Sequence, residues 1–85
     1  MTIDLSQISS MEEFHQQFKE RLGFPDFYGN NWNAFWDAIT GLAEMPDVLV
    51  IENFSNFEKH FPSDAQILKE LIHKYNLNHG YIELN

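Results

Sequence analysis

Val48-Leu49-Val50-Ile51 is an unbroken run of branched apolar residues near the middle of an 85-residue chain. A run so short and so apolar is typical of a strand buried at the centre of a sheet. Two further strands are predicted around it. Residues 2–5 alternate apolar and polar side chains briefly, as an edge strand does, and residues 81–84 follow Gly80, which interrupts the preceding pattern.

Helical patterns fill the interval before the central run. Ser9 or Ser10 is placed to head a capping box, because a glutamate follows each of them after three residues. Apolar residues then recur at helical spacing as far as Gly23, which favours the end of a helix. The predicted inward positions of this first helix are Met11, Phe14, Phe18 and Leu22.

A turn and a second helix complete that interval. Residues 24–29 contain a proline and end on Gly29, which tolerates a positive φ, so they predict a turn. Residues 31–45 then predict a helix that is capped by Asn30 or Asn31 and stopped by the proline that follows it.

The interval after the central run predicts two more helices. A short one begins at Asn53 or Ser55 and ends at Pro62, and Ser63 caps the other. The apolar residues expected to face inward on this last helix are Ile67, Leu68, Leu71 and Ile72. The order is therefore β-α-α-β-α-α-β. Strands separated by helices need crossover connections, so we predict an α/β fold with a three-stranded parallel sheet, in a single domain of residues 1–85.

Composition excludes several function classes. The chain has no cysteine and a net charge of −8, with only five lysines and arginines. Phosphate recognition needs basic side chains, so nucleic acids and anionic membranes are poor direct ligands, and a cationic protein is the natural complement. His15, His60, His73 and His79 match no compact metal-ligand spacing, so we expect no metal or other cofactor. The N-terminus resembles no signal peptide, and we expect a cytoplasmic protein.

The second predicted helix lies inside a window of uncompensated negative charge. Residues 22–58 contain six carboxylates and no lysine or arginine. At 100° per residue, Phe35, Ala38, Ile39, Leu42 and Met45 form one apolar stripe, and Asp37, Gly41 and Glu44 lie on the polar face. Trp32 and Trp36 lie at the border between these two faces. They are therefore either the periphery of a core or anchors for a partner.

Asp37 is unusual for a residue in the middle of a helix. It has poor helix propensity, and no basic residue stands three or four positions away. Gly41 on the same face also disfavours a helix, and it allows another backbone to approach closely. A solvated aspartate remains one interpretation of this pattern. A surface that binds a partner is the other.

These residues carry a resemblance to a known family. Tyr28-Gly29-Asn30-Asn31-Trp32-Asn33-Ala34-Phe35-Trp36-Asp37-Ala38-Ile39-Thr40-Gly41 resembles the corresponding segment of the barstar family, inhibitors of the secreted ribonuclease barnase. Phe14-His15, Pro25 and Met45-Pro46 extend the likeness along nearly the whole chain. The resemblance implies a three-stranded parallel sheet, which agrees with the predicted order. It also implies that the second helix and the preceding loop plug the active site of a ribonuclease.

The resemblance implies specific roles for single residues. Asp37 matches the carboxylate that enters the phosphate-binding pocket of the ribonuclease, and Asn31, Trp36, Thr40 and Gly41 match other contact positions. The chain departs from the family where Phe27 replaces a tyrosine, Asn33 an aspartate, Trp32 a leucine and Leu42 a tryptophan, and where His73 aligns with a glutamate. The predicted partner-binding residues are Phe27, Asn31, Trp32, Asn33, Trp36, Asp37, Thr40, Gly41, Leu42, Glu44 and His73.

The predicted function is therefore inhibition of a basic bacterial ribonuclease, or immunity against a toxin nuclease, by a free monomer that forms a 1:1 complex. Two alternatives stay open. A barstar-like module could bind proteins without inhibiting a ribonuclease. Asp37 and Glu44 could also serve as paired carboxylates in an enzyme, although so small a chain shows no loop-rich cleft, and we predict no enzymatic activity.

Overall fold

The structure is a computed structural model that describes residues 1–85. Three strands and four α-helices follow one another in the order β-α-α-β-α-α-β, and all strand pairs are parallel. The predicted α/β class is thus confirmed. The chain forms two compact units, one of Met1–Gln7 with Pro46–Asn85 and the other of Ile8–Met45. None of the helices combines the length and the apolar character needed to cross a membrane.

The first unit contains the sheet. Its strands are β1 (Thr2–Asp4), β2 (Val48–Glu52) and β3 (Tyr81–Leu84), in the spatial order β1-β2-β3. The central position of β2 and the edge position of β1 agree with the prediction. The prediction that the whole central run is buried is wrong, because Val48 is 47% exposed on the sheet face opposite Leu49 and Ile51. Alternate residues of a strand point to the same side of a sheet. The side chains on one face of this sheet are almost completely buried. These buried residues are Ile3, Leu49, Ile51 and Ile82.

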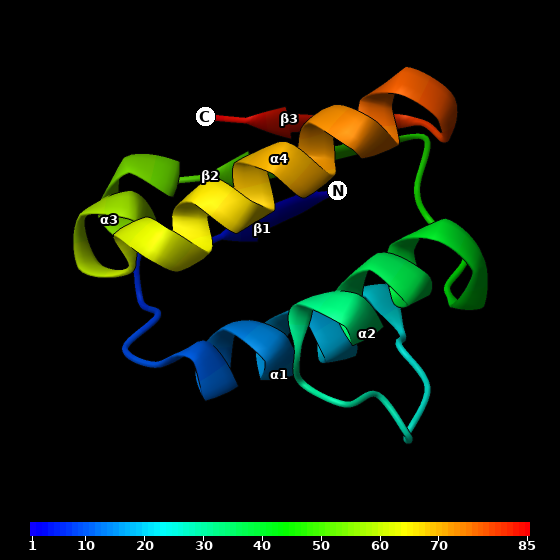
Figure 1. Ribbon diagram of the computed structural model, residues 1–85, viewed down its shortest axis with the longest axis horizontal. Helices are drawn as coiled ribbons and strands as arrows, with labels where there is room; N and C mark the ends of the chain where they lie inside the picture. Colours follow the sequence, from blue (N-terminus) through cyan, green and yellow to red (C-terminus); the bar gives the residue numbers. More distant parts are fainter. The chain divides into compact units, whose positions relative to one another are not determined.

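Two helices accompany the sheet in this unit, α3 (Phe54–His60) and α4 (Pro62–Asn78). Figure 1 shows α4 running alongside the strands, with α3 beside its first turn. The predicted cap at Ser63 is wrong, because α4 already begins at Pro62, where a missing N–H costs nothing and φ is preset for a helix. The inward prediction holds for the buried Leu68 and Ile72 but not for Ile67, which is exposed.

A side chain of α4 satisfies the backbone groups of one residue at the free edge of β3. Asn76 on α4 accepts a hydrogen bond of 2.7 Å from the backbone N–H of Ile82 and donates one of 2.8 Å to its carbonyl. One amide side chain therefore satisfies both backbone groups of an edge residue, which would otherwise be available to another chain.

The second unit begins with α1 (Met11–Leu22). Ser10 is its N-cap and accepts a hydrogen bond of 3.1 Å from the N–H of Glu13. The carboxylate of Glu13 reaches back to the N–H and hydroxyl of Ser9, at 3.0 and 2.9 Å, and these bonds lower its pKa. Both predicted serines thus take part in the cap. Gly23 ends α1 in the left-handed region with φ 69°, as predicted.

The turn before the next helix differs from the prediction at one residue. The residue with positive φ is Asn30, at 51°, and not Gly29. Asparagine tolerates this conformation better than most side chains. Asn31 then caps α2 (Trp32–Asp37), because its side chain accepts a hydrogen bond of 2.8 Å from the N–H of Ala34.

The helix that begins at Trp32 changes its winding at Ala38. From there to Leu42 the backbone is a π-helical turn, η1, whose bond from the N–H of Ala43 to the carbonyl of Ala38 is 2.9 Å long. The predicted helix of residues 31–45 is therefore too long, and Met45 lies outside it. A π turn holds more residues than an α turn, so each residue advances by less than 100° and the helical wheel loses its phase. Leu42, predicted to be inward, is 53% exposed.

Aromatic rings form the core of the second unit. Phe35 lies 5.3 Å from the ring centroid of Phe18 and 5.9 Å from that of Phe14, and both of those residues come from α1. The centroids of Phe24 and Trp32 lie 6.2 and 5.3 Å from it. Edge and tilted arrangements at these distances are favourable for aromatic pairs. Because Phe35 precedes Trp36 and Asp37 directly, this packing fixes the backbone from which both project.

Candidate partner-binding site

The structure places most of the predicted partner-binding residues on one short stretch of the second unit. Ten of the eleven lie between Phe27 and Glu44, in the turn, in α2 and η1, and just beyond them. His73 is the exception, since it lies on α4 in the other unit. We call the stretch of residues 27–44 the plug segment.

Asp37 is exposed at the junction of α2 and η1. Its carboxylate forms no hydrogen bond and no ion pair, and it caps no helix. The second unit contains six carboxylates and only two cations, Lys19 and Arg21, both of which lie on α1. Asp37 therefore presents a negative charge that nothing in the plug segment compensates.

Two large apolar side chains of the plug segment are exposed as well. Phe27 is 76% exposed in the turn, and Leu42 is 53% exposed at the end of η1. Gly41 beside Leu42 is exposed, and no heavy atom lies within 4 Å of the position that a Cβ would occupy there. These exposed apolar side chains and the open backbone at Gly41 are available for contact with another protein.

Two polar residues of the segment have a structural role in the free chain. Asn31 caps α2 through its oxygen and donates a bond of 3.1 Å from its nitrogen to the carbonyl of Gly29. Thr40 donates a bond of 2.6 Å from its hydroxyl to the carbonyl of Trp36, one turn earlier. These bonds hold the plug segment in shape before any partner arrives.

The plug segment contains two tryptophans. The half-buried ring of Trp32 packs on Phe14 and His15, with centroids 5.3 and 5.7 Å apart, which supports the core-periphery interpretation for this residue. Trp36 is also half-buried. Trp36 stays a predicted anchor for a partner.

The arrangement does not favour the enzyme interpretation. Glu44 lies beyond the end of η1, so it is not two helical turns from Asp37 on a shared face, as the sequence had suggested. Asn33 and Glu44 are exposed and form no hydrogen bond with the rest of the chain. No three His, Asp or Glu side chains gather closely enough to hold a metal ion.

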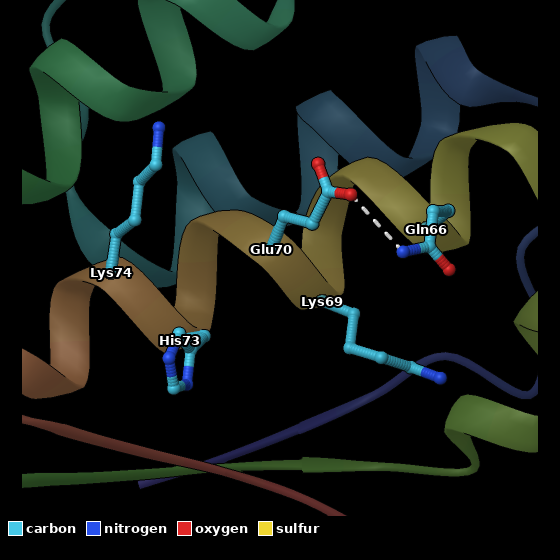
Figure 2. Close-up of a pocket in the computed structure, with 5 residues that line it drawn as sticks. All are labelled: Gln66, Lys69, Glu70, His73 and Lys74. Atoms are coloured by element: carbon cyan, nitrogen blue, oxygen red, sulfur yellow. Dashed lines mark hydrogen bonds between the residues drawn. The ribbon is translucent and has the colours of Figure 1, made fainter.

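His73 lines a pocket of about 440 Å³ on α4. Figure 2 shows that the side chains around it point in different directions, with Lys69 and His73 on one side of the helix and Glu70 and Lys74 on the other. Gln66 donates a hydrogen bond of 3.1 Å to Glu70. The charges do not converge on one point, so the pocket has no arrangement that would select a small ionic ligand.

Comparison with known proteins identifies the family. The family model described as "Barstar (barnase inhibitor)" matches residues 1–80. The chain belongs to the barstar family. It is also 37% identical over 70 residues to a Bacillus subtilis (strain 168) protein named "Putative ribonuclease inhibitor YrdF", a match that covers 82% of this chain and 77% of the relative. The resemblance seen in the sequence is thus confirmed.

One buried polar pair in this barstar-family chain was missed by sequence reasoning. His15 is buried on α1, and its Nδ1 shares a hydrogen bond of 2.6 Å with the hydroxyl of Tyr28 in the turn. The bond links the turn that leads into α2 to the helix before it. The sequence contained a signal, since a histidine beside core positions needs a polar partner once it is buried.

Burial raises the pKa of the Tyr28 phenol above its ordinary value of about 10. Above about pH 10 the unfolded chain releases the phenol proton while the folded chain keeps it. The free energy of unfolding should therefore fall as pH rises, by roughly 1.4 kcal/mol per pH unit from Tyr28. We expect Tyr28→Phe to lose about 1 kcal/mol near pH 7, where the bond to His15 disappears. That deficit should shrink or reverse near pH 11, as measured by urea unfolding. A deficit that stays constant between pH 7 and pH 11 would contradict a raised pKa for Tyr28 in the folded chain.

Proposed function

We propose that this barstar-family chain inhibits a basic bacterial ribonuclease, or a toxin nuclease, by inserting the plug segment into the active site of that enzyme. The observation that carries the proposal is the exposed, uncompensated carboxylate of Asp37 between the exposed apolar side chains of Phe27 and Leu42 in the sequence. The family description and the name of the relative support the same target class. The chain would act by occlusion and would perform no catalysis.

Electrostatics explains why a ribonuclease suits this segment. An enzyme that cleaves RNA must hold a phosphate, so its active site presents cationic side chains. A carboxylate that enters such a site takes the place of the phosphate and accepts charge-assisted hydrogen bonds, which are stronger than bonds between neutral groups. The net charge of −8 would also draw the chain towards a basic enzyme before contact.

The departures from the family in the plug segment bear on which enzyme is bound. Phe27 and Leu42 favour apolar recesses in the partner where other family members present a phenol and an indole. Asn33 removes one negative charge close to Asp37, so the partner would need fewer cations there. We infer a target related to barnase in the charge of its active site, bound as a 1:1 complex by a cytoplasmic, single-domain monomer.

Titration of the purified chain against a panel of basic microbial ribonucleases and toxin nucleases tests the proposal. We expect stoichiometric inhibition of at least one enzyme, and an association rate that falls as salt is raised because screening weakens steering. Binding without inhibition would replace the proposal with the interaction-module alternative. Failure to bind any enzyme of the panel would overturn it.

Gly41 gives a test of close backbone approach. A methyl group there meets no atom of the free chain, so Gly41→Ala should leave stability unchanged or raise it by up to about 1 kcal/mol. If a partner backbone lies against this residue, the same methyl should weaken inhibition about tenfold or more, because overpacking at a tight contact is destabilising. Thermal unfolding and inhibition constants measure the two effects. Unchanged inhibition would place Gly41 outside the contact.

A further inference from the structure

The sheet of the first unit has a second face that its own helices leave exposed. Residues opposite one another in the strand register share a face, so the pairing defines its members. Val48 and Tyr81 form one row, Thr2, Val50 and Glu83 the next, and Asp4 and Glu52 the last. We call this set of seven residues the outer face. Its first row is apolar and about half exposed, with values of 47% for Val48 and 49% for Tyr81.

An exposed face is unusual for this kind of sheet. Purely parallel sheets occur almost always with both faces covered, because their strands are joined by crossover connections. On the outer face, Thr2, Asp4 and Glu52 are exposed, and Val50 and Glu83 are half-buried. The residues of the opposite face are almost completely buried. The outer face is thus an accessible surface with an apolar end and a polar end.

The polar end of the outer face is acidic. Asp4, Glu52 and Glu83 are its charged members, and the three strands contain no lysine, arginine or histidine. The carboxylate of Glu83 accepts hydrogen bonds only from neutral groups, from Asn85 at 2.7 Å and from Tyr81 at 3.4 Å, and the carboxylate of Glu52 accepts none. Bonds from Asn53 and from Ser6 lower the pKa of Asp4, so this carboxylate is charged at neutral pH.

Size and charge together restrict what can cover the outer face. Strand spacings of about 4.8 Å and a rise of about 3.3 Å per residue give a face of roughly 200 Å². A stable interface between globular domains buries about 800 Å² of accessible surface on each partner, so this face alone would form only a small part of one. A second copy of the chain would also bring like charges together. A short basic segment fits both limits.

We propose that the outer face is a second docking site, which binds a short basic segment of a partner protein. Apolar side chains of the segment lie over Val48 and Tyr81, and its lysines or arginines lie over Glu52, Glu83 and Asp4. None of these residues belongs to the plug segment, so the proposal does not rest on ribonuclease inhibition. A chain that inhibits no ribonuclease can still bind such a segment, and the reverse also holds.

The test uses the full chain, labelled with ¹⁵N, and a short synthetic peptide that has Phe and Leu at one end and Lys and Arg at the other. We expect saturable shifts of the amides of Val48, Val50, Tyr81 and Glu83, and weaker binding as salt is raised. A control peptide with Glu in place of the basic residues should not bind. Absence of saturable shifts, shifts confined to other elements, or equal binding of the acidic peptide would overturn the proposal.

Variants separate this site from a general affinity for peptides. Val48→Thr keeps the β-branched shape and Glu52→Gln removes one charge, and the double variant should bind the basic peptide roughly three- to tenfold more weakly. Leu77→Ala is the matched control, because it shortens another exposed apolar side chain outside the outer face, on α4. Equal losses in both variants would contradict the proposal. So would shifts of the same amides on concentrating the chain alone, which would indicate self-association.

Discussion

Replacing Asp37 with alanine should weaken inhibition of the partner nuclease by a factor of a hundred or more and leave the fold as stable as before. Removing one member of a buried charge pair costs about 2–5 kcal/mol, because the cations in the partner lose their counter-charge inside a closed interface. In the free chain the carboxylate forms no hydrogen bond and no ion pair, so the fold has no interaction to lose. Alanine also has the better helix propensity.

The comparison of Asp37→Asn with Glu12→Gln separates the contact made by the Asp37 carboxylate from the effect of the net charge of the chain. Both variants remove one negative charge, and both residues are exposed, but Glu12 lies on α1 outside the plug segment. We expect Asp37→Asn to raise both the dissociation rate and the inhibition constant, whereas Glu12→Gln should only slow association slightly. Thermal unfolding of both variants checks the fold. Full inhibition by Asp37→Ala would refute the proposed plug.

Much of the fold could be predicted because local and long-range preferences agree. The run Val48-Leu49-Val50-Ile51 combines β-branching with an absence of polar residues, and only the centre of the sheet suits it. Gly23 marks the end of α1 because few other residues adopt its φ of 69°. The order of elements then requires crossover connections, which makes the sheet parallel.

The winding of the chain after Asp37 could not be predicted in this way. A helical wheel assumes a constant 100° per residue, and the π turn at Ala38–Leu42 breaks that assumption. The apolar pattern continues through Leu42, so composition alone gives no sign of the change. The consequence matters for the site, since Leu42 is exposed and available to a partner instead of lying in the core.

The candidate site also combines features that local sequence predicts with features that depend on packing. The exposure of Asp37 followed from its place on the polar face of the predicted helix, which is a local property. The bond between His15 and Tyr28 joins residues 13 positions apart, and its existence depends on how the turn folds back onto α1. Similarly, helical spacing could not show that Trp32 packs on the rings of α1. Local patterns predicted the candidate surface, and packing shows how Trp32 and Tyr28 are held within it.

Replacing Phe35 with alanine should have one of the largest effects on stability in the second unit. The side chain is 1% exposed and lies among the rings of Phe14, Phe18, Phe24 and Trp32. Deleting a buried phenyl ring costs about 3–5 kcal/mol. The free energy of unfolding of a small domain is only about 5–15 kcal/mol in total. The midpoint of thermal unfolding should therefore fall by roughly 15–30 °C. Circular dichroism during heating and urea unfolding measures the change.

Phe27→Ala is the matched control, because it deletes the same ring from a side chain that is 76% exposed, and its cost should stay within about 0.5 kcal/mol. The two variants should also differ in inhibition. Phe35→Ala should lose inhibition in proportion to its unfolded fraction and regain it on cooling, since Phe35 acts by fixing the backbone beneath Asp37. Phe27→Ala should lose inhibition while fully folded, because its ring is offered to the partner. A loss below about 1 kcal/mol for Phe35→Ala would mean that the aromatic cluster does not hold the plug segment in place.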